Sequence, residues 1–383
     1  MTVVLAPDSF KESMTAARAA AAMADGVRAV FPDAVCREIP MADGGEGTAD
    51  ALVAALDGRW RAVRTRDHRG RPVEARYGLT ADGLAVIEGA AVIGLGLVPP
   101  GERDVMASTS RGVADLVRDA LDQGATRLVV GLGGTGTSDA GAGLLAGLGA
   151  RWLDADSLPL DPTPSGLARL DRVDLSGLDP RVRATRIDLA CDVTNPLLGP
   201  QGAAAVFAPQ KGATPVQVPV LDAIATRVAD TLTHAGLPDV RQLPGAGAAG
   251  GLGAAFLSLG AHRRAGVEVV AEAARLEEAV AGANLVLTGE GAIDAQTLAG
   301  KAPAGVAAVA ARHGVPVMAF AGRVGDGEDA LLRAGFAAIV PITPATADLA
   351  TALADGPENL KHAVDTALRR WAADGSPTGA WRP

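Results

Sequence analysis

The segment Ala283–Ala321, ANLVLTGEGAIDAQTLAGKAPAGVAAVAARHGVPVMAFA, decides the fold class of this chain. It contains an apolar run at Ala283–Thr288, a small-residue helical pattern at Pro303–Arg312 and a second apolar run at Val315–Ala321. Two short apolar runs that flank a helical pattern are typical of a β-α-β unit with parallel strands. The segment therefore predicts a buried parallel sheet.

The same alternation continues on both sides of this segment and at the start of the chain. Further strands are expected at Ala337–Pro341, Thr2–Pro7 and Val35–Ile39, and a helix is expected at Met14–Phe31, which Pro32 ends. We therefore expect an α/β protein whose doubly wound, Rossmann- or flavodoxin-like parallel-sheet domain is discontinuous. It would comprise residues 1–65 and 280–383.

The middle of the chain has a different pattern. Trp60–Thr65, Pro72–Leu79 and Leu84–Ile87 are consecutive strand-like runs, with a turn at Arg69-Gly70, which predicts antiparallel or mixed pairing. We expect residues 66–279 to form a second, inserted mixed α/β domain, with the active site in the cleft between the two domains. Within it, the Pro- and Asp-rich stretch 155–182 is expected to be a loop.

Composition and charge exclude several classes of protein. The 383-residue chain has a net charge of −9 and no run of Lys or Arg, which argues against a nucleic-acid partner. No uncharged apolar run reaches the roughly 18 residues of a membrane span, and the first residues lack the pattern of a signal peptide. We therefore expect a cytoplasmic protein, and its oligomeric state stays open, a homodimer being one alternative.

Lysine is rare in this chain. It occurs at only four positions among the 35 Lys and Arg residues: 11, 211, 301 and 361. Three of these lysines lie in Gly-, Ser- or Pro-rich stretches, whereas Lys361 has the pattern of a helix surface. Because an ammonium group is not interchangeable with a guanidinium fork, we expect Lys11 and Lys301 to contact anionic ligand groups. For Lys211 a functional role and chance retention weigh equally.

Acidic and glycine-rich clusters follow the predicted strands. In parallel α/β sheets the carboxyl ends of the strands face the ligand crevice, so these clusters predict one shared site. The clusters are Asp8-Ser9, Asp43-Gly44-Gly45-Glu46-Gly47-Thr48, Gly131–Gly136, Asp192 with Asn195, and Gly289–Asp294.

The content of these clusters fits phosphoryl transfer. That chemistry needs carboxylates for Mg²⁺, cations and backbone N–H groups for phosphate oxygens, and a group that orients the acceptor hydroxyl. Asp43 and Glu46 flank two glycines, which suits a metal or hydroxyl contact. A tight turn with an acidic helix cap is the structural alternative for the same residues. There is no Walker A motif, since Gly300-Lys301 is followed by Ala302.

The loop Gly131-Leu132-Gly133-Gly134-Thr135-Gly136 supports a rival hypothesis. It matches G-x-G-x-x-G, and Asp154 lies at about the spacing of a ribose-binding acid, as in an NAD(P)-dependent dehydrogenase. Alternatively, Asp139 or Ser138 caps a helix, and the loop amides bind phosphate or carboxylate. A non-catalytic protein that binds phosphorylated metabolites is a third alternative.

Taken together, the motifs resemble those of the bacterial glycerate kinase family, of the glycerate 2-kinase type. The resemblance spans residues 6–301. The motifs that carry it are Ala6-Pro7-Asp8-Ser9-Phe10-Lys11, Ala42–Thr48, Cys191-Asp192-Val193-Thr194-Asn195-Pro196-Leu197, Ala208-Pro209-Gln210-Lys211-Gly212-Ala213, Gly247–Gly251, and Gly289-Glu290-Gly291 through Asp294, Gln296, Thr297, Gly300 and Lys301. Two departures are Ser138-Asp139-Ala140-Gly141, where the family usually has Asn and a double glycine, and Ala292, where it often has Arg.

The resemblance implies an ATP- and Mg²⁺-dependent kinase with two α/β domains, D-glycerate as substrate and 2-phosphoglycerate as the favoured product. From their chemistry we expect Lys11, Asp43, Asp192 and Glu290 to be catalytic, and Asp43, Glu46, Asp192 and Glu290 to be the candidate Mg²⁺ ligands. The remaining candidates for substrate or nucleotide binding are Asp8, Ser9, Glu46, Gly133, Gly134, Thr135, Asp139, Asn195, Lys211, Asp294 and Lys301.

The scarcity of lysine generates a first prediction. Lys11→Met is expected to lower kcat/KM for glycerate phosphorylation by at least ~10²-fold, the scale of one lost charged contact to the transition state. Lys361→Met is the matched control and should leave the kinetics unchanged. Steady-state kinetics of both variants test this, and near-normal kinetics of Lys11→Met would remove Lys11 from the site.

Overall fold

The structure is a computed structural model that describes residues 1–45, 47–294, 297–298, 300–326, 328–344 and 348–373. Its internal contacts divide the chain into two compact units. Unit 1 comprises Met1–Asp43, Asp50–Asp57 and Val267–Pro383, and unit 2 comprises Gly44–Ala49 and Gly58–Gly266. The domain boundaries expected from the sequence, near 65 and 280, differ from these bounds and stay a prediction.

Unit 1 is built on a five-stranded parallel sheet with the order β13-β12-β11-β1-β2. The strands are β1 (Thr2–Leu5), β2 (Val35–Glu38), β11 (Leu285–Ile293), β12 (Val317–Val324) and β13 (Phe336–Pro341). Read from the β2 edge, this is the flavodoxin-type order 2-1-3-4-5, whose direction reverses between β1 and β11. In this central pair, β1 and β11 run parallel and Val3 of β1 lies opposite Leu285 of β11.

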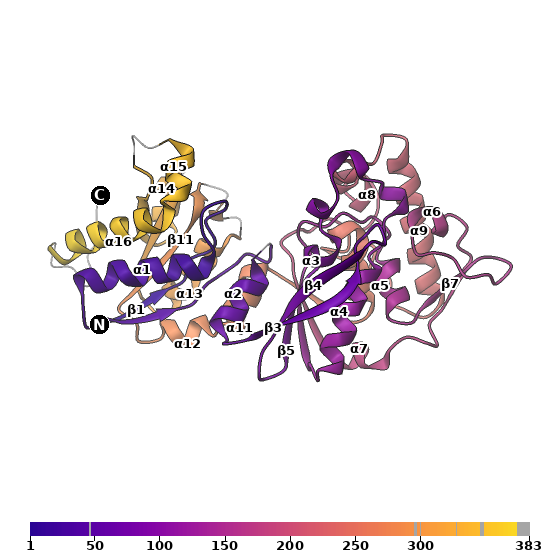
Figure 1. Cartoon of the computed structure of the whole chain (residues 1–383), viewed down its shortest axis with the longest axis horizontal. Helices are drawn as coiled ribbons and strands as arrows, with labels where there is room; N and C mark the ends of the chain where they lie inside the picture. The colour runs from indigo at the N-terminus through magenta and orange to yellow at the C-terminus, as the bar shows by residue number, and fades with distance from the viewer. Residues whose placement is uncertain (46, 295–296, 299, 327, 345–347, 374–383) are drawn as a thin grey trace. The chain divides into compact units, whose positions relative to one another are not determined.

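Helices cover both faces of the unit 1 sheet. The helices of unit 1 are α1 (Ala16–Val30), α2 (Thr48–Ala55, whose first two residues belong to unit 2), α11 (Gly266–Ala273, whose first residue belongs to unit 2), α12 (Leu276–Val280), α13 (Ala302–Arg312), α14 (Glu328–Arg333), α15 (Leu349–Ala354) and α16 (Gly356–Ala373). Helices α1 and α16 lie side by side (Figure 1) and share a core with Val3 and Leu5 of β1. Because side chains alternate along a strand, the equally buried Val4 faces the opposite side, where α13 packs on β11 and β12.

Unit 2 contains a six-stranded mixed sheet with the order β10-β9-β6-β5-β4-β3. Pairing is parallel from β10 to β5 and antiparallel between β5, β4 and β3. The strands are β3 (Arg59–Arg66), β4 (Pro72–Leu79), β5 (Leu84–Glu88), β6 (Arg127–Gly131), β9 (Arg186–Ala190) and β10 (His262–Arg264). The predicted fold class is thus confirmed: a doubly wound parallel sheet and a second, mixed sheet.

Helices pack on this sheet around the larger hydrophobic core of the chain. The helices of unit 2 are α3 (Ala90–Ile93), α4 (Arg111–Asp122), α5 (Ala142–Gly147), α6 (Pro164–Leu167), α7 (Pro180–Ala184), α8 (Ala203–Phe207), α9 (Gln217–His234) and α10 (Leu252–Ser258), with 3-10 turns η1 (Leu95–Leu97), η2 (Pro100–Glu102), η3 (Val105–Ala107), η4 (Pro209–Lys211) and η5 (Ala248–Gly251).

The expectation of a loop over residues 155–182 is wrong. This stretch contains α6, strand β8 (Arg172–Asp174) and the start of α7, and β8 pairs antiparallel with β7 (Arg151–Leu153). The buried Trp152 anchors the two-stranded ribbon, because its Nε1 donates a hydrogen bond to the Ala142 carbonyl at 2.9 Å. Short elements of this size carry too few periodic residues to be recognised in a sequence.

Two loops of unit 2 meet in left-handed backbone conformations. Ala140 and Ala249 both have φ of 53°, and the neighbouring Gly250 has φ of 67°. A Cβ atom on Gly250 would lie 1.9 Å from the Thr137 carbonyl oxygen, so only glycine fits there. Alanine in this left-handed region is strained by about 1–2 kcal/mol, so both Ala140 and Ala249 carry backbone strain.

The strain at Ala140 generates a second prediction. In Ala140→Gly, relief of the strain should offset the lost methyl group and the added chain entropy, so the free energy of unfolding should fall by less than ~0.5 kcal/mol. Ala142→Gly, two residues away, equally buried and helical, should cost at least ~1.5 kcal/mol. Equilibrium urea unfolding measures both, and equal losses in the two variants would contradict the assignment of strain.

Candidate active site

The first part of the candidate site lies in unit 1, where β1 and β11 end. The pairing of the two strands continues past β1, since the Asp8 N–H donates to the Gly289 carbonyl at 2.8 Å. This interaction places Asp8 beside Glu290, which the sequence analysis located after the strand but which lies within β11. The pair occupies the point where the strand order reverses, the usual position of a ligand crevice in such sheets.

Asp8 is a buried carboxyl group, with only 9% of its surface exposed. Burial raises the pKa of Asp8 to about 7, and the neighbouring Asp43 and Glu290 carboxylates add to this effect. The Ser9 N–H opposes it by donating to Asp8 Oδ1 at 2.6 Å. Three carboxyl groups are therefore close enough in unit 1 to repel one another, which favours a cation or a proton between them.

Glu290 is paired with the half-buried Lys301. Lys301 Nζ lies 3.4 Å from Glu290 Oε2, and the Thr297 hydroxyl donates to Glu290 Oε1 at 2.9 Å. Burial raises the pKa of Glu290, while Lys301 and Thr297 oppose the shift. Lys301 is also the residue that directly precedes α13, so its backbone lies at the positive end of that helix dipole.

The remaining unit 1 candidates surround this group. Lys11 is exposed in the turn that follows β1, and its backbone nitrogen lies beside Gly291 of β11. Ser9 is half-buried. Asp294 donates its N–H to the Thr297 hydroxyl at 3.2 Å, and its carbonyl accepts the Thr297 N–H, so it shapes the turn after β11. Glu46 lies outside the described residues.

The second part of the candidate site lies in unit 2, at the carboxyl ends of β5 and β6. Gly133 and Gly134 are exposed and Thr135 is buried. Hydrogen bonds hold this loop in place, since Leu95 N–H donates to the Gly134 carbonyl and Gly136 N–H to the Ile93 carbonyl. The Gly44-Gly45 turn packs against it, because a Cβ atom on Gly131 would lie 3.2 Å from the Gly44 carbonyl oxygen.

Glu88 is a site residue that the sequence analysis missed. It is the last residue of β5, and its Oε1 accepts the Ala49 N–H at 2.8 Å. This bond satisfies an N–H group in the first turn of α2 and ties the start of that helix to the end of β5. The signal was present, since Glu88 follows a predicted strand as the other clusters do.

The loop geometry does not match a dinucleotide fingerprint. In that motif the helix starts within the glycines, but here residues 137–141 separate Gly136 from α5, which has only six residues. Asp154 accepts the N–H groups of Asp156 and Leu158 in its own turn on the β7–β8 ribbon. The dehydrogenase hypothesis therefore loses both of its supporting features.

Asp139 and Lys211 are buried inside unit 2. Asp139 is fully buried and accepts four hydrogen bonds, from the Ser110 N–H and hydroxyl and from the Gly141 and Gly143 N–H groups. Burial raises the pKa of Asp139, and these donors oppose the shift. Lys211 is 3% exposed and donates from Nζ to the Thr137 carbonyl at 2.6 Å.

Asp192 and Asn195 follow β9. Asp192 is exposed, and its Oδ1 accepts the Gly266 N–H at 3.1 Å. The Asn195 amide donates to the Gln201 carbonyl at 2.8 Å, and the Asn195 carbonyl accepts the Gly247 N–H. The Asn195 side chain thus stabilises the turn that carries it.

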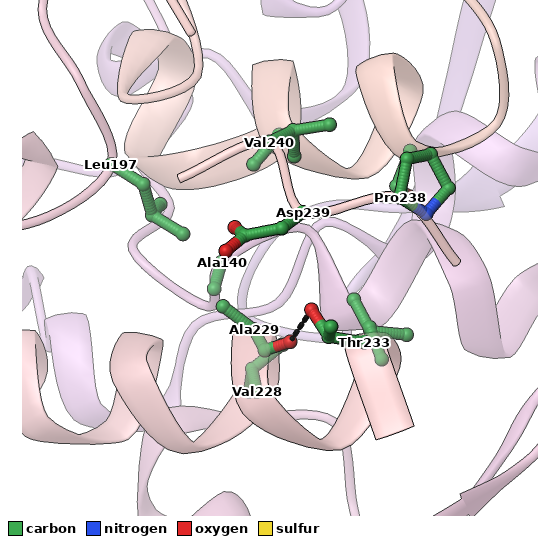
Figure 2. Close-up of a pocket in the computed structure, with 11 residues that line it drawn as sticks. Ala140, Leu197, Val228, Ala229, Thr233, Pro238, Asp239 and Val240 are labelled. Carbon is green, nitrogen blue, oxygen red and sulfur yellow. Dashed lines mark hydrogen bonds between the residues drawn. The ribbon is translucent and has the colours of Figure 1, made fainter. Parts of the chain in front are cut away.

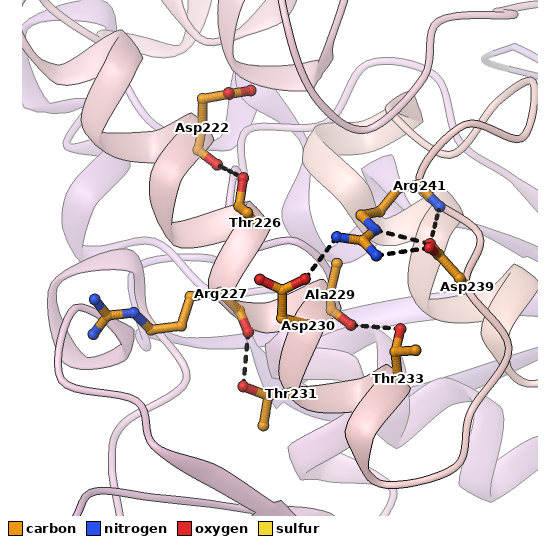
Figure 3. A network of polar contacts seen from close by, with 9 residues as sticks. All are labelled: Asp222, Thr226, Arg227, Ala229, Asp230, Thr231, Thr233, Asp239 and Arg241. Atoms are coloured by element: carbon orange, nitrogen blue, oxygen red, sulfur yellow. Dashed lines mark hydrogen bonds and ion pairs between the residues drawn. The ribbon is translucent and has the colours of Figure 1, made fainter.

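A network of ion pairs centred on Arg241 contacts this turn. Figure 3 shows Arg241 between Asp230 of α9, at 2.6 Å, and Asp239, at 2.7 Å. The Arg241 carbonyl accepts the Leu197 N–H, which fixes the turn two residues after Asn195. Leu197 also lines a cavity of about 10 Å³ with Ala140 (Figure 2). So small a volume is at the lower limit for one water molecule, so the core beneath the site is closely packed.

The described residues hold no group of three or more His, Cys, Asp or Glu side chains with the geometry of a metal site. In the part of the chain that the structure describes, no helix is long and apolar enough to span a bilayer.

Fold and site together define a class of protein. Buried carboxylates and a lysine lie at the switch point of a flavodoxin-type sheet, and a loop with two exposed glycines follows a strand of a second sheet. These features are those of an α/β enzyme that handles anionic, phosphate-bearing substrates.

Comparison with known proteins identifies the family. The glycerate kinase family matches residues 3–372. The chain is 44% identical over 363 residues to glycerate kinase of Bacillus subtilis (strain 168), covering 94% of this chain and 95% of that protein. It is 42% identical over 362 residues to glycerate 2-kinase of Escherichia coli (strain K12), covering 94% and 95%. The chain therefore belongs to the glycerate kinase family, as its motifs predicted.

A solved structure supports the same assignment. A crystal structure assigned to glycerate kinase 2 of Salmonella typhimurium LT2 matches with a TM-score of 0.91 and 43% sequence identity, covering 98% of this chain and 99% of that one. The family assignment confirms the prediction of a kinase.

The burial of Asp8 generates a third prediction, on stability. A carboxyl group whose pKa is raised from 3.8 to about 7 keeps its proton in the folded state after the unfolded state has lost it. Its contribution therefore destabilises the protein progressively as pH rises from about 4 to about 7. Asp8→Asn should raise the free energy of unfolding at pH 8, by up to ~4 kcal/mol, and change it little at pH 4.

Urea unfolding at both pH values, in buffer with a chelator, measures this difference. Asp365→Asn is the matched control in unit 1, because Arg369 holds the pKa of Asp365 below its ordinary value. That variant should lose stability at pH 8. A gain of stability in Asp8→Asn that is equal at pH 4 and pH 8 would contradict a buried carboxyl group as its source.

Proposed function

We propose that this protein transfers the γ-phosphoryl group of ATP to D-glycerate and releases ADP and 2-phosphoglycerate. The observation that carries the proposal is the family match over residues 3–372. The name of the Escherichia coli relative, a glycerate 2-kinase at 42% identity, supports the 2-position as the acceptor.

In this proposal the unit 1 residues handle the transferred phosphoryl group. Lys11 is exposed and Lys301 is half-buried, so both ammonium groups can bind phosphate or carboxylate oxygens. The Asp43 and Glu290 carboxylates are the first candidates to hold Mg²⁺, which would screen phosphate charge there. Asp8 is kept close by its bond to the Gly289 carbonyl and orients its neighbours.

The unit 2 residues are proposed to bind the anionic end of a substrate. Gly133, Gly134 and Thr135 can supply loop amides and a hydroxyl, because glycines let an anion approach the backbone closely. Asp192 is a further candidate for Mg²⁺ or the acceptor hydroxyl, as is Glu46. Asn195 acts through the turn that it stabilises.

The reaction itself needs little covalent help from the protein. The glycerate hydroxyl oxygen forms a bond to the γ-phosphorus as the bond to the ADP oxygen breaks, and the hydroxyl proton passes to a carboxylate. In our proposal that carboxylate belongs to the Asp8, Asp43 and Glu290 group, where neighbouring negative charge favours proton uptake. A substrate cleft between two domains and a cytoplasmic location stay predictions, and the oligomeric state stays open.

Turnover is the fourth prediction and tests the function directly. Purified protein with Mg-ATP and D-glycerate should release ADP in a coupled assay, and phosphorus NMR should identify 2-phosphoglycerate as the product. Reactions without glycerate, and with L-glycerate, measure background ATP hydrolysis and stereochemical preference. The absence of ADP release across a panel of hydroxy acids would reject the proposal, and 3-phosphoglycerate as main product would reject the 2-position.

A further inference from the structure

Lys211 is a buried lysine that has no place in the chemistry proposed above. It ends the short η4 turn, which a small apolar cluster that includes Ala208 and Leu221 anchors. From there its side chain enters the interior of unit 2, and Nζ donates to the Thr137 carbonyl at 2.6 Å. Thr137 is the residue that directly follows the glycine loop Gly131–Gly136.

The charge of Lys211 lies among groups that tolerate it. Burial lowers the pKa of Lys211 to about 8, and the nearby Asp139 carboxylate opposes this shift. Asp139 in turn accepts four hydrogen bonds, from residues at the start of α4 and α5. Because Asp139 has these donors of its own, loss of the Lys211 charge would not leave a buried carboxylate unpaired.

The segment that Lys211 contacts, Thr137-Ser138, also contains buried hydroxyl groups without a hydrogen-bond partner. Among the described residues, four buried side-chain atoms have no hydrogen-bond partner, and two of them are Thr137 Oγ1 and Ser138 Oγ. A third, Nδ1, belongs to His68, whose ring packs on Gly136. Buried polar atoms without partners are rare, and their gathering beside one loop marks it as more than a packing element.

We propose that Lys211 is a positioning residue for the glycine loop. Its ammonium group holds the Thr137 carbonyl, which fixes the chain where it leaves the loop and so keeps Gly133–Thr135 in the shape that binds a substrate anion. The identity of that substrate, ATP or D-glycerate, rests on the proposed function.

The test compares Lys211→Met with Lys361→Met, which removes an exposed lysine from α16. In Lys211→Met, the KM of one substrate should rise at least about tenfold, the scale of one lost charge-assisted hydrogen bond. The KM of the other substrate and kcat should stay within about threefold of the wild type. Lys361→Met should match the wild type in all three constants. Lys211→Gln, which keeps an N–H donor, undergoes the same measurements and replaces the Met variant if that does not fold.

Hydrogen exchange on the free protein gives a readout that is independent of turnover. Peptides that cover residues 131–140 should exchange faster in Lys211→Met, while peptides from α9 and from unit 1 keep their wild-type rates. Unchanged KM values, a fall in kcat alone, or faster exchange throughout unit 2 would each overturn the inference. If the wild type itself shows no turnover, the proposed function fails, and the exchange rates still decide the role of Lys211.

Discussion

The constraint on which unit 1 depends is the desolvation of negative charge where β1 and β11 end. Parallel pairing of these two strands is obligatory for the fold, and it brings Asp8 next to Glu290 whatever those side chains prefer. Burial raises the pKa of both groups, and the Asp43 carboxylate adds to the effect on each. Two hydrogen-bond donors, the Ser9 N–H and the Thr297 hydroxyl, and the Lys301 ammonium group partly offset this negative charge. A site that is incompletely neutralised in this way is poised to accept a metal-bound phosphate or a proton.

In unit 2 the corresponding constraint acts on the glycine loop Gly131–Gly136, whose backbone is held by contacts on both sides. Backbone bonds to residues 93–95 hold one side of the loop, and the Glu88 contact to Ala49 holds the neighbouring turn. Beyond the loop, the chain is fixed by the close approach of Gly250 to Thr137 and by the donors around Asp139. The left-handed conformation of Ala140 is the strain that this fixed path imposes.

The sequence predicted the elements whose pattern is local and long, and it missed those whose role depends on distant contacts. The apolar runs around Thr288 and Val317 identified the parallel sheet correctly, because their periodicity reports burial directly. Glu290 was placed after its strand, since glycines within β11 resemble a strand end. Glu88 was overlooked although it follows a predicted strand, and its partner, the Ala49 N–H, lies 39 positions away in sequence. The burial of Lys211 was not predictable either, because its environment is assembled from residues 70 or more positions away in sequence.

The surroundings of the lysines explain why an ammonium group suits some positions of this arginine-rich chain better than a guanidinium group. A guanidinium group keeps its charge under all conditions and is too broad for a narrow interior site. Lys211 occupies such a site, where burial lowers its pKa and Nζ donates to the Thr137 carbonyl. Lys301 shares its charge between the Glu290 carboxylate and the Ala292 carbonyl, which a compact donor can do without displacing Thr297. Lys11 and Lys361 are both exposed, but Lys11 follows a strand that ends at the site and Lys361 does not. Position relative to the sheet, rather than exposure, therefore separates a candidate catalytic lysine from a surface one.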